Sequence, residues 1–315
     1  MSDGAVTARG GEVRPPHRFG RELSPRVLGV AMNLPTLLTL TLVLAYPIYY
    51  AGYLSMHKVS LVQLRTGVFP FVGFDNYAKV LDDPLFLLSL GNTLLFTAFT
   101  VFCEVVLAVA IAILINQQDV WTSRITRFLI LLPYAVPPIA NGLIWSFIYN
   151  GKLGFLNRLL YSVGAIDGPI DWSGNADTAL YAVAVPYIWR TLPFAILLVH
   201  AALQGINKEL FEAASVDGAG AWYRFRHITL PLIMPVIVVL LVLRTSFAVA
   251  VFDEVLAITQ GGPGDATWVA SWYSYKKGFA PPFDIGAGAA SAFLLALLVA
   301  TLALIYIKLL YRRVD

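Results

Sequence analysis

The chain has 315 residues, of which 58% are apolar and 13% charged, and its mean hydropathy is +0.72. Soluble domains are about a quarter charged, so this composition excludes an ordinary soluble protein and predicts a surface that faces lipid. The net charge of +3 comes without a basic cluster interleaved with aromatic residues, which argues against nucleic-acid binding. The single cysteine, Cys103, excludes an internal disulfide.

Six apolar stretches are long enough to cross a bilayer. A spanning helix needs about 20 mainly apolar residues, because each residue adds 1.5 Å across a core of about 30 Å. The stretches cover 28–56, 86–115, 127–149, 179–203, 232–258 and 286–311. We therefore predict an all-α membrane protein with a polar tail at 1–27 and one polytopic bundle of six transmembrane helices at 28–315. Prolines interrupt several spans, which suits a transporter better than a simple anchor.

The distribution of Lys and Arg predicts the orientation of the bundle, because short cytoplasmic loops carry an excess of both. With the N-terminus inside, the cytoplasmic segments hold 13 of the 22 basic residues. These segments are 1–27, 116–127, 203–230 and 308–315. The count predicts that both termini and the loop 203–230 face the cytoplasm.

The loop 203–230 has a structure of its own. Residues 208–216 are rich in the strong helix formers Ala and Glu, and Gly218 is placed to end that helix. A second short helix rich in aromatic and basic residues follows, and Pro231 is expected to begin the next span. Two short amphipathic helices at the membrane surface form either a plain connector or a lever that a soluble partner can grip.

The same loop contains the pattern Glu-Ala-Ala, three residues, Gly, nine residues, Ile, one residue, Leu-Pro. This pattern resembles the coupling motif of permease subunits in ATP-binding-cassette importers, and the Asp-Gly-Ala within it is common in the sugar-importing branch. The matching residues are Glu212, Ala213, Ala214, Asp217, Gly218, Ala219, Ile228, Leu230 and Pro231. The resemblance implies that the loop docks in a cleft of an ATPase subunit, with the glutamate and the following turn as the main contact.

Further stretches, in the same order along the chain, resemble the first permease subunit of maltose, trehalose and glycerol-3-phosphate importers. They are 72–77, 92–93, Arg127 with 132–133 and Trp145, 252–253, 256–263 and 284–290. The resemblance implies a multi-pass protein of the bacterial inner membrane. Its implied partners are a second homologous permease, ATP-binding-cassette ATPase subunits, and an extracytoplasmic sugar-binding protein or lipoprotein.

No Gly-x4-Gly-Lys-Ser/Thr loop occurs in the sequence, so we expect no ATPase site here. The chain is then a conduit and not an enzyme, and it binds no cofactor. ATP and Mg are used by the partner ATPase. The histidines have no metal-binding spacing, and we expect no metal site. They are His17, His57, His200 and His227.

Ionisable side chains inside spans are costly and usually face the bundle interior. Glu104 and Arg244 lie at similar depth in the second and fifth predicted spans, which predicts a structural ion pair, with a transport role as the alternative. Arg190 is a third such residue. Asp253 and Glu254 lie near the outer end of the fifth span, where they either meet water or line the route of the substrate.

A sugar site needs aromatic faces and short polar groups. The candidates on the third and fifth spans are Asn141, Trp145, Phe247, Phe252 and Asp253. A di- or oligosaccharide is the expected substrate, with glycerol-3-phosphate as an alternative, and the site could instead lie wholly in the partner permease. Two other classes stay open: a secondary transporter that couples protons through Glu104 or Asp253, and a non-transport membrane scaffold. Six spans without an evident internal repeat argue against the former.

Overall fold

The computed structural model describes residues 24–152 and 154–310, and most of the predicted tail 1–27 lies outside these residues. Within them the protein is helical, and its extended pairing is limited to one bridge between His57 and Phe71. The chain divides into two compact units, 1–50 and 51–315, which are described separately. The boundary between these two units falls inside the first predicted span, 28–56.

The first unit contains α1 (Pro25–Leu40), a π-helical segment (Thr41–Ala45) and the start of α2 (Tyr46–Ser55). Its apolar side chains are largely exposed, as in the case of Leu42 at 71%. The helices of the second unit are α3 (Leu61–Thr66), α4 (Asp75–Leu81), α5 (Pro84–Asn116), α6 (Val120–Leu131), α7 (Pro138–Ile148), α8 (Phe155–Ser162), α9 (Ala176–Gln204), α10 (Lys208–Val216), α11 (Ala221–Arg224), α12 (Leu230–Val249), α13 (Asp253–Ile258), α14 (Ala270–Phe279) and α15 (Ile285–Leu310).

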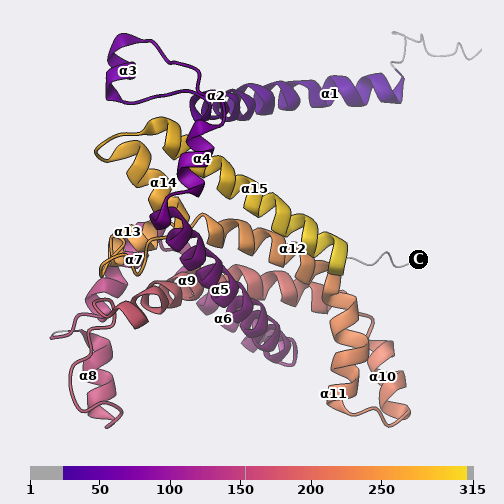
Figure 1. Ribbon diagram of the computed structural model, residues 1–315. Helices are drawn as coiled ribbons and strands as arrows, with labels where there is room; N and C mark the ends of the chain where they lie inside the picture. The colour runs from indigo at the N-terminus through magenta and orange to yellow at the C-terminus, as the bar shows by residue number, and fades with distance from the viewer. Residues whose placement is uncertain (1–23, 153, 311–315) are drawn as a thin grey trace, which may run out of the picture. The chain divides into compact units, whose positions relative to one another are not determined.

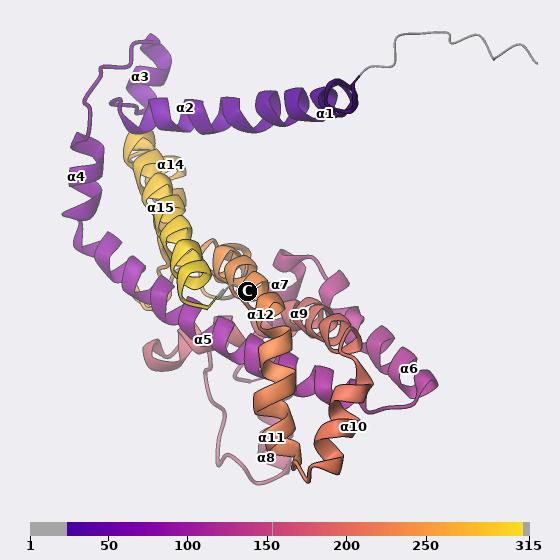
Figure 2. The same ribbon diagram turned by 90° about the vertical axis from the view of Figure 1, so that its right-hand side faces the viewer.

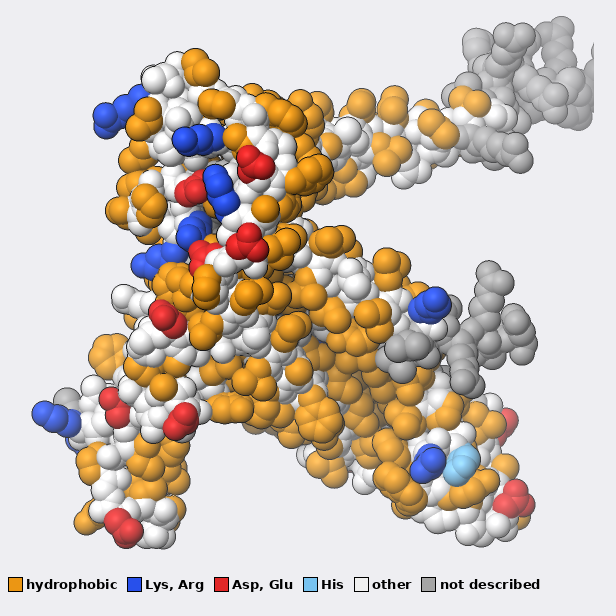
Figure 3. Space-filling view, viewed as in Figure 1, with side chains coloured by type: hydrophobic (Ala, Val, Ile, Leu, Met, Phe, Trp, Pro, Cys, Tyr) orange, Lys and Arg blue, Asp and Glu red, His pale blue; other side chains and the backbone are white. Residues whose placement is uncertain are grey.

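Five helices of the described chain are long and apolar enough to cross a membrane. They are Val27–Ser55, Pro84–Asn116, Ala176–Gln204, Ala221–Val249 and Ile285–Lys308. Each corresponds to a predicted span. Figure 3 shows hydrophobic side chains over α5, α12 and α15, with charged side chains gathered toward the ends of these helices. This distribution is the one that a bilayer requires.

The third predicted span, 127–149, is a bent pair of helices, as its prolines indicated. It consists of α6 with a short 3₁₀ turn (Leu132–Ala135), followed by α7, and the two parts meet at an angle of 94°. Val136 is extended at φ −76° and ψ 125° because the following Pro137 disfavours the helical region for the residue before it. Pro138 then starts α7 at the first position of a helix, where a missing N–H is harmless.

The fifth predicted span, 232–258, is wrong in its bounds. Its helix is continuous with the preceding α11 through a π-helical segment (Phe225–Thr229), so the span begins at Ala221 and ends at Val249. The wider π turn lies directly before Pro231, which cannot donate to the helical ladder. After a break, α13 starts anew with Asp253 and Glu254 in its first turn, where the helix dipole favours acids.

The core of the second unit is organised around α5, which packs against α9, α12 and α14. One buried cluster lies around Phe96, Tyr187 and Trp272, and another around Ala108, Ile196 and Leu240. In the second cluster, small residues of α5 pack against larger side chains of α9 and α12. Figures 1 and 2 show α5 crossing α9 and α12.

Several residues in the stretches 72–77, 92–93 and 284–290 stabilise the segments that connect helices. The Asn76 amide donates to the carbonyl oxygens of Ser55 and His57 at 2.8 and 2.9 Å. A side chain at Gly286 would meet these same groups, since a Cβ there would lie 2.5 Å from the His57 oxygen. Asn92 donates to the Trp268 carbonyl at 2.9 Å. These residues therefore fix loops between helices and are explained by the fold.

Candidate functional site

The coupling pattern lies on a projection formed by α10 and α11, which we call the α10–α11 projection. The side chain of Asn207 accepts a hydrogen bond from the Glu209 N–H at 3.0 Å and so caps the start of α10. Gly218 ends the helix in the left-handed region, at φ +77°, which glycine adopts without steric cost. Figures 1 and 2 show the two short helices side by side beyond the ends of α9 and α12.

The residues of the pattern that precede the turn are accessible. Glu212, Ala213, Asp217 and Gly218 are exposed, while Ala214 is half-buried. Arg224 of α11 donates from Nη1 to the Ser215 hydroxyl at 2.5 Å, which ties α11 to α10. The projection is thus a defined pair of helices that presents the carboxylates of Glu212 and Asp217 and a glycine turn to the outside.

The remaining residues of the pattern anchor the projection. Ala219 and Ile228 are half-buried, and Leu230 and Pro231 form the first turn of α12, with Leu230 half-buried and Pro231 exposed. Because α11 continues into α12, the second arm of the projection is an extension of a membrane-spanning helix.

The predicted contact between Glu104 and Arg244 is present. Arg244 Nη2 donates to Glu104 Oε1 at 2.8 Å, and both side chains are buried, at 4% and 0% exposure. The Thr191 hydroxyl of α9 also donates to this carboxylate. Three spanning helices, α5, α9 and α12, therefore meet at one satisfied ion pair.

A second ion pair, between half-buried Arg190 and buried Glu254, was missed by the sequence reasoning. Arg190 Nη2 donates to Glu254 Oε1 at 2.9 Å, and Glu254 is 2% exposed. Of the two alternatives for Glu254, contact with water is therefore wrong. Its depth was inferred by continuing the fifth span to residue 258, whereas the break after Val249 turns α13 back against α7 and α9.

Tyr187 lies between the two pairs. The guanidinium carbons of Arg244 and Arg190 lie 5.7 and 6.0 Å from the centre of its ring, within cation–π range. We call Glu104, Arg244, Tyr187, Arg190 and Glu254 the Tyr187 cluster. Its two carboxylates balance its two guanidinium groups, so the cluster is neutral and joins α5, α9, α12 and α13.

The predicted substrate residues are placed in two different settings. Asn141 is fully buried and donates to the Pro186 carbonyl at 3.1 Å, so its amide joins α7 to α9, although its Oδ1 makes no hydrogen bond. The ring of Trp145 contacts those of Trp189 and Tyr149 at 6.0 and 5.3 Å. Gly142 permits α7 to approach α13, since a Cβ at this position would lie 2.5 Å from that of Ala257.

On α12 and α13 the setting differs. Phe252 packs between the rings of Trp272 and Tyr275, at 5.6 and 4.9 Å, and Asp253 is half-buried. Phe247 is 61% exposed and is the most accessible of the candidates. The structure brings α7 and α13 together but leaves Phe247 on an open face of α12. In the described residues no three His, Cys, Asp or Glu side chains are grouped so that they could hold a metal ion.

Comparison with known proteins agrees with the geometry. Residues 104–315 match the family described as "Binding-protein-dependent transport system inner membrane component". The chain is 35% identical to the trehalose/maltose transport system permease protein MalF of Thermococcus litoralis, over 89% of this chain and 92% of that protein. It is 34% identical to the sulfoquinovosyl glycerol transport system permease protein SmoG of Agrobacterium fabrum, over 91% and 92%.

The fold also matches a solved structure, that of a bacterial alginate ABC transporter in complex with alginate pentasaccharide-bound periplasmic protein. The TM-score is 0.75 at 22% sequence identity, and the match covers 90% of this chain and 93% of that chain. At this identity the match establishes the arrangement of helices.

Proposed function

The chain belongs to the family of binding-protein-dependent transport system inner membrane components, and we propose that it is one of two membrane-spanning subunits of an ATP-driven sugar importer. The observation that carries this proposal is the α10–α11 projection, which presents Glu212 and the Gly218 turn where a soluble subunit can reach them. Because the family consists of components of binding-protein-dependent transport systems, we do not retain the secondary transporter that couples protons through Glu104 or Asp253.

We place the projection in the cytoplasm, together with both termini, on the distribution of Lys and Arg between the loops. There it would dock in a cleft of an ATPase subunit, and that partner would bind and hydrolyse ATP with Mg. A second permease would complete the pathway, and a sugar-binding protein would deliver the substrate from the other side. Closure of the ATPases would move the projection and change which side of the membrane the pathway faces.

A di- or oligosaccharide is the proposed substrate. The names of the two relatives, which refer to trehalose or maltose and to sulfoquinovosyl glycerol, support a carbohydrate. Within the Tyr187 cluster both guanidinium groups are paired with carboxylates, so neither offers a free cation to a phosphorylated ligand. Asn141, Trp145, Phe252 and Asp253 remain proposed contacts on the α7–α13 side, and Phe247 remains one on α12.

The test is co-purification of the ATPase with the chain from gently solubilised native membranes. The Glu212→Lys variant should lose the ATPase while keeping the second permease, because it reverses the charge of the glutamate at the proposed contact. Asp167→Lys is the matched control: Asp167 is also exposed, but it lies before α9, at the end of that 29-residue helix remote from α10. If the wild type brings down no ATPase, the proposal fails.

A further inference from the structure

An apolar groove of about 980 Å³ lies behind the α10–α11 projection. Its floor is α5, with Val105, Val109 and Ile113, and its opposite wall is α12, with Met234 and Ile237. Phe211 of α10 and Trp222 of α11 line it where it meets the projection. Neither pair of buried charges nor any proposed substrate contact belongs to this groove.

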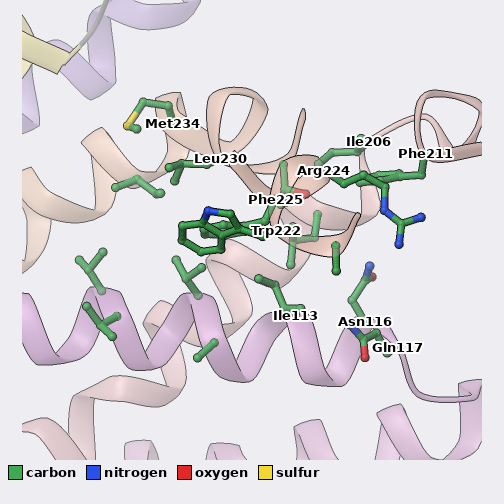
Figure 4. Close-up of a pocket in the computed structure, with 18 residues that line it drawn as sticks. Ile113, Asn116, Gln117, Ile206, Phe211, Trp222, Arg224, Phe225, Leu230 and Met234 are labelled. Carbon is green, nitrogen blue, oxygen red and sulfur yellow. The ribbon is translucent and has the colours of Figure 1, made fainter. Parts of the chain in front are cut away.

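The groove changes character along its length. Figure 4 shows Asn116, Gln117 and Arg224 together at one end, whereas Met234 and Leu230 lie toward the other. The lining, as far as the structure describes it, includes an arginine and no carboxylate. Trp222 is 70% exposed, and in Figure 4 its ring lies nearer to Leu230 than to the polar end.

The length of the groove corresponds to one leaflet. From Val105 to Gln117 the axis of α5 advances by 12 residues, which is about 18 Å at 1.5 Å per residue. Half of a bilayer core of about 30 Å is about 15 Å. The polar end therefore falls at the headgroup level of the leaflet on the side of the projection, and the apolar end falls near the bilayer midplane.

We propose that this groove is a binding site for an anionic phospholipid. The acyl chain lies along α5 between Val105 and Ile113, and the phosphate accepts hydrogen bonds from Arg224 and from the amides of Asn116 and Gln117. An amphiphile matches the groove, because it is apolar at one end and polar at the other. A helix of another protein would present an apolar surface along its whole length, including the polar end of the groove. Basic pockets between spanning helices on the cytoplasmic side suit anionic headgroups.

Such a lipid would also act on the proposed coupling element. It would fill the space beneath Phe211 and Trp222 and so support the projection against α5. The site depends on the chain lying in a bilayer and not on the identity of the sugar, so it can fail while the importer proposal stands.

The experiment measures phospholipid bound to the complex by native mass spectrometry after exchange into vesicles of phosphatidylcholine with or without phosphatidylglycerol. The wild type should retain phosphatidylglycerol in preference to phosphatidylcholine. Arg224→Gln should lower this preference about fivefold, the usual effect of one basic residue near an anionic headgroup. Ala110→Trp, which fills the groove, should remove both lipids.

Two further variants separate a lipid site from a damaged projection. Ser215→Ala removes the partner of Arg224 on α10 but keeps the charge, and it should bind lipid as the wild type does. Arg224→Lys should restore most of the preference. Equal retention of phosphatidylglycerol by Arg224→Gln and the wild type overturns the proposal. So does crosslinking to the second permease from Ile113→Cys labelled with a thiol-reactive photo-crosslinker, which would show that protein fills the groove.

Discussion

The buried pair of Glu104 and Arg244 gives the sharpest test of how the spanning helices are held. Replacing Glu104 by Gln keeps the size of the side chain and its contact with Thr191 but removes the negative charge. Arg244 would then be a buried cation at 4% exposure, with the Tyr187 hydroxyl 3.5 Å from Nη2 as a neutral neighbour. We expect Glu104→Gln to destabilise the protein.

The magnitude follows from the burial of both groups. Removing one partner of a buried ion pair costs about 3–5 kcal/mol, because the other charge stays buried without compensation. The remaining amide oxygen and the Tyr187 hydroxyl lessen this cost, so we expect about 3 kcal/mol, roughly a hundredfold in the unfolding equilibrium. The double variant Glu104→Gln with Arg244→Met removes the orphaned cation and should regain most of the lost stability.

The assay is the free energy of unfolding in mixed micelles, measured for the two single variants, the double variant and the wild type. Asp167→Asn serves as the control, since an exposed carboxylate should change stability by less than about 0.5 kcal/mol. A cost for Glu104→Gln as small as that of the control would refute the reasoning. Strict additivity of the two single changes in the double variant would also refute it, because it would show that the residues do not interact.

Two further predictions concern charge and backbone outside the membrane. Burial alone would raise the pKa of Asp83, but hydrogen bonds from Lys277, at 2.9 Å, and Tyr273 hold it below its usual value. The contribution of the Asp83 carboxylate to folding stability is therefore complete above its unfolded-state pKa and is lost as the pH falls through its folded-state pKa. When thermal unfolding is followed at decreasing pH, the wild type should lose more stability than Asp83→Asn. Gly218→Ala places a Cβ at φ +77° and should cost about 1 kcal/mol and weaken ATPase binding, whereas Gly220→Ala, at φ −68°, should do neither. Equal ATPase retention by the two glycine variants in a pull-down would contradict the second prediction.

Hydropathy predicted the spans well because it responds to length and composition, which a bilayer constrains directly. It failed at two places where the chain stays apolar while the backbone turns. Pro137 and Pro138 bend the third span by 94°, although the apolar run continues through them. The segment 250–252 is apolar too, so nothing in the composition marks the end of α12 at Val249.

The same reasoning explains which charges could be paired from the sequence. Glu104 and Arg244 both lie on continuous helices, so counting residues from the helix ends gave their depths correctly. Glu254 follows the break after Val249, where the count no longer measures depth, and its partner Arg190 lies 64 residues away on another helix. Asn141 shows a third case, because it was predicted as a sugar contact and its bond to the Pro186 carbonyl gives it a structural role.

The Tyr187 cluster bears on how movement of the projection would reach the membrane. The first arm of the projection follows α9 directly, and the second arm continues into α12. Along α12, Arg244 lies 14 residues after Leu230, about 21 Å into the span. There the ion pair fixes α12 to α5 and, through Thr191, to α9, so these helices cannot slide past one another without separating buried charges. Displacement of the projection would then be carried as a rigid-body movement to α13, which the Arg190–Glu254 ion pair joins to the middle of α9.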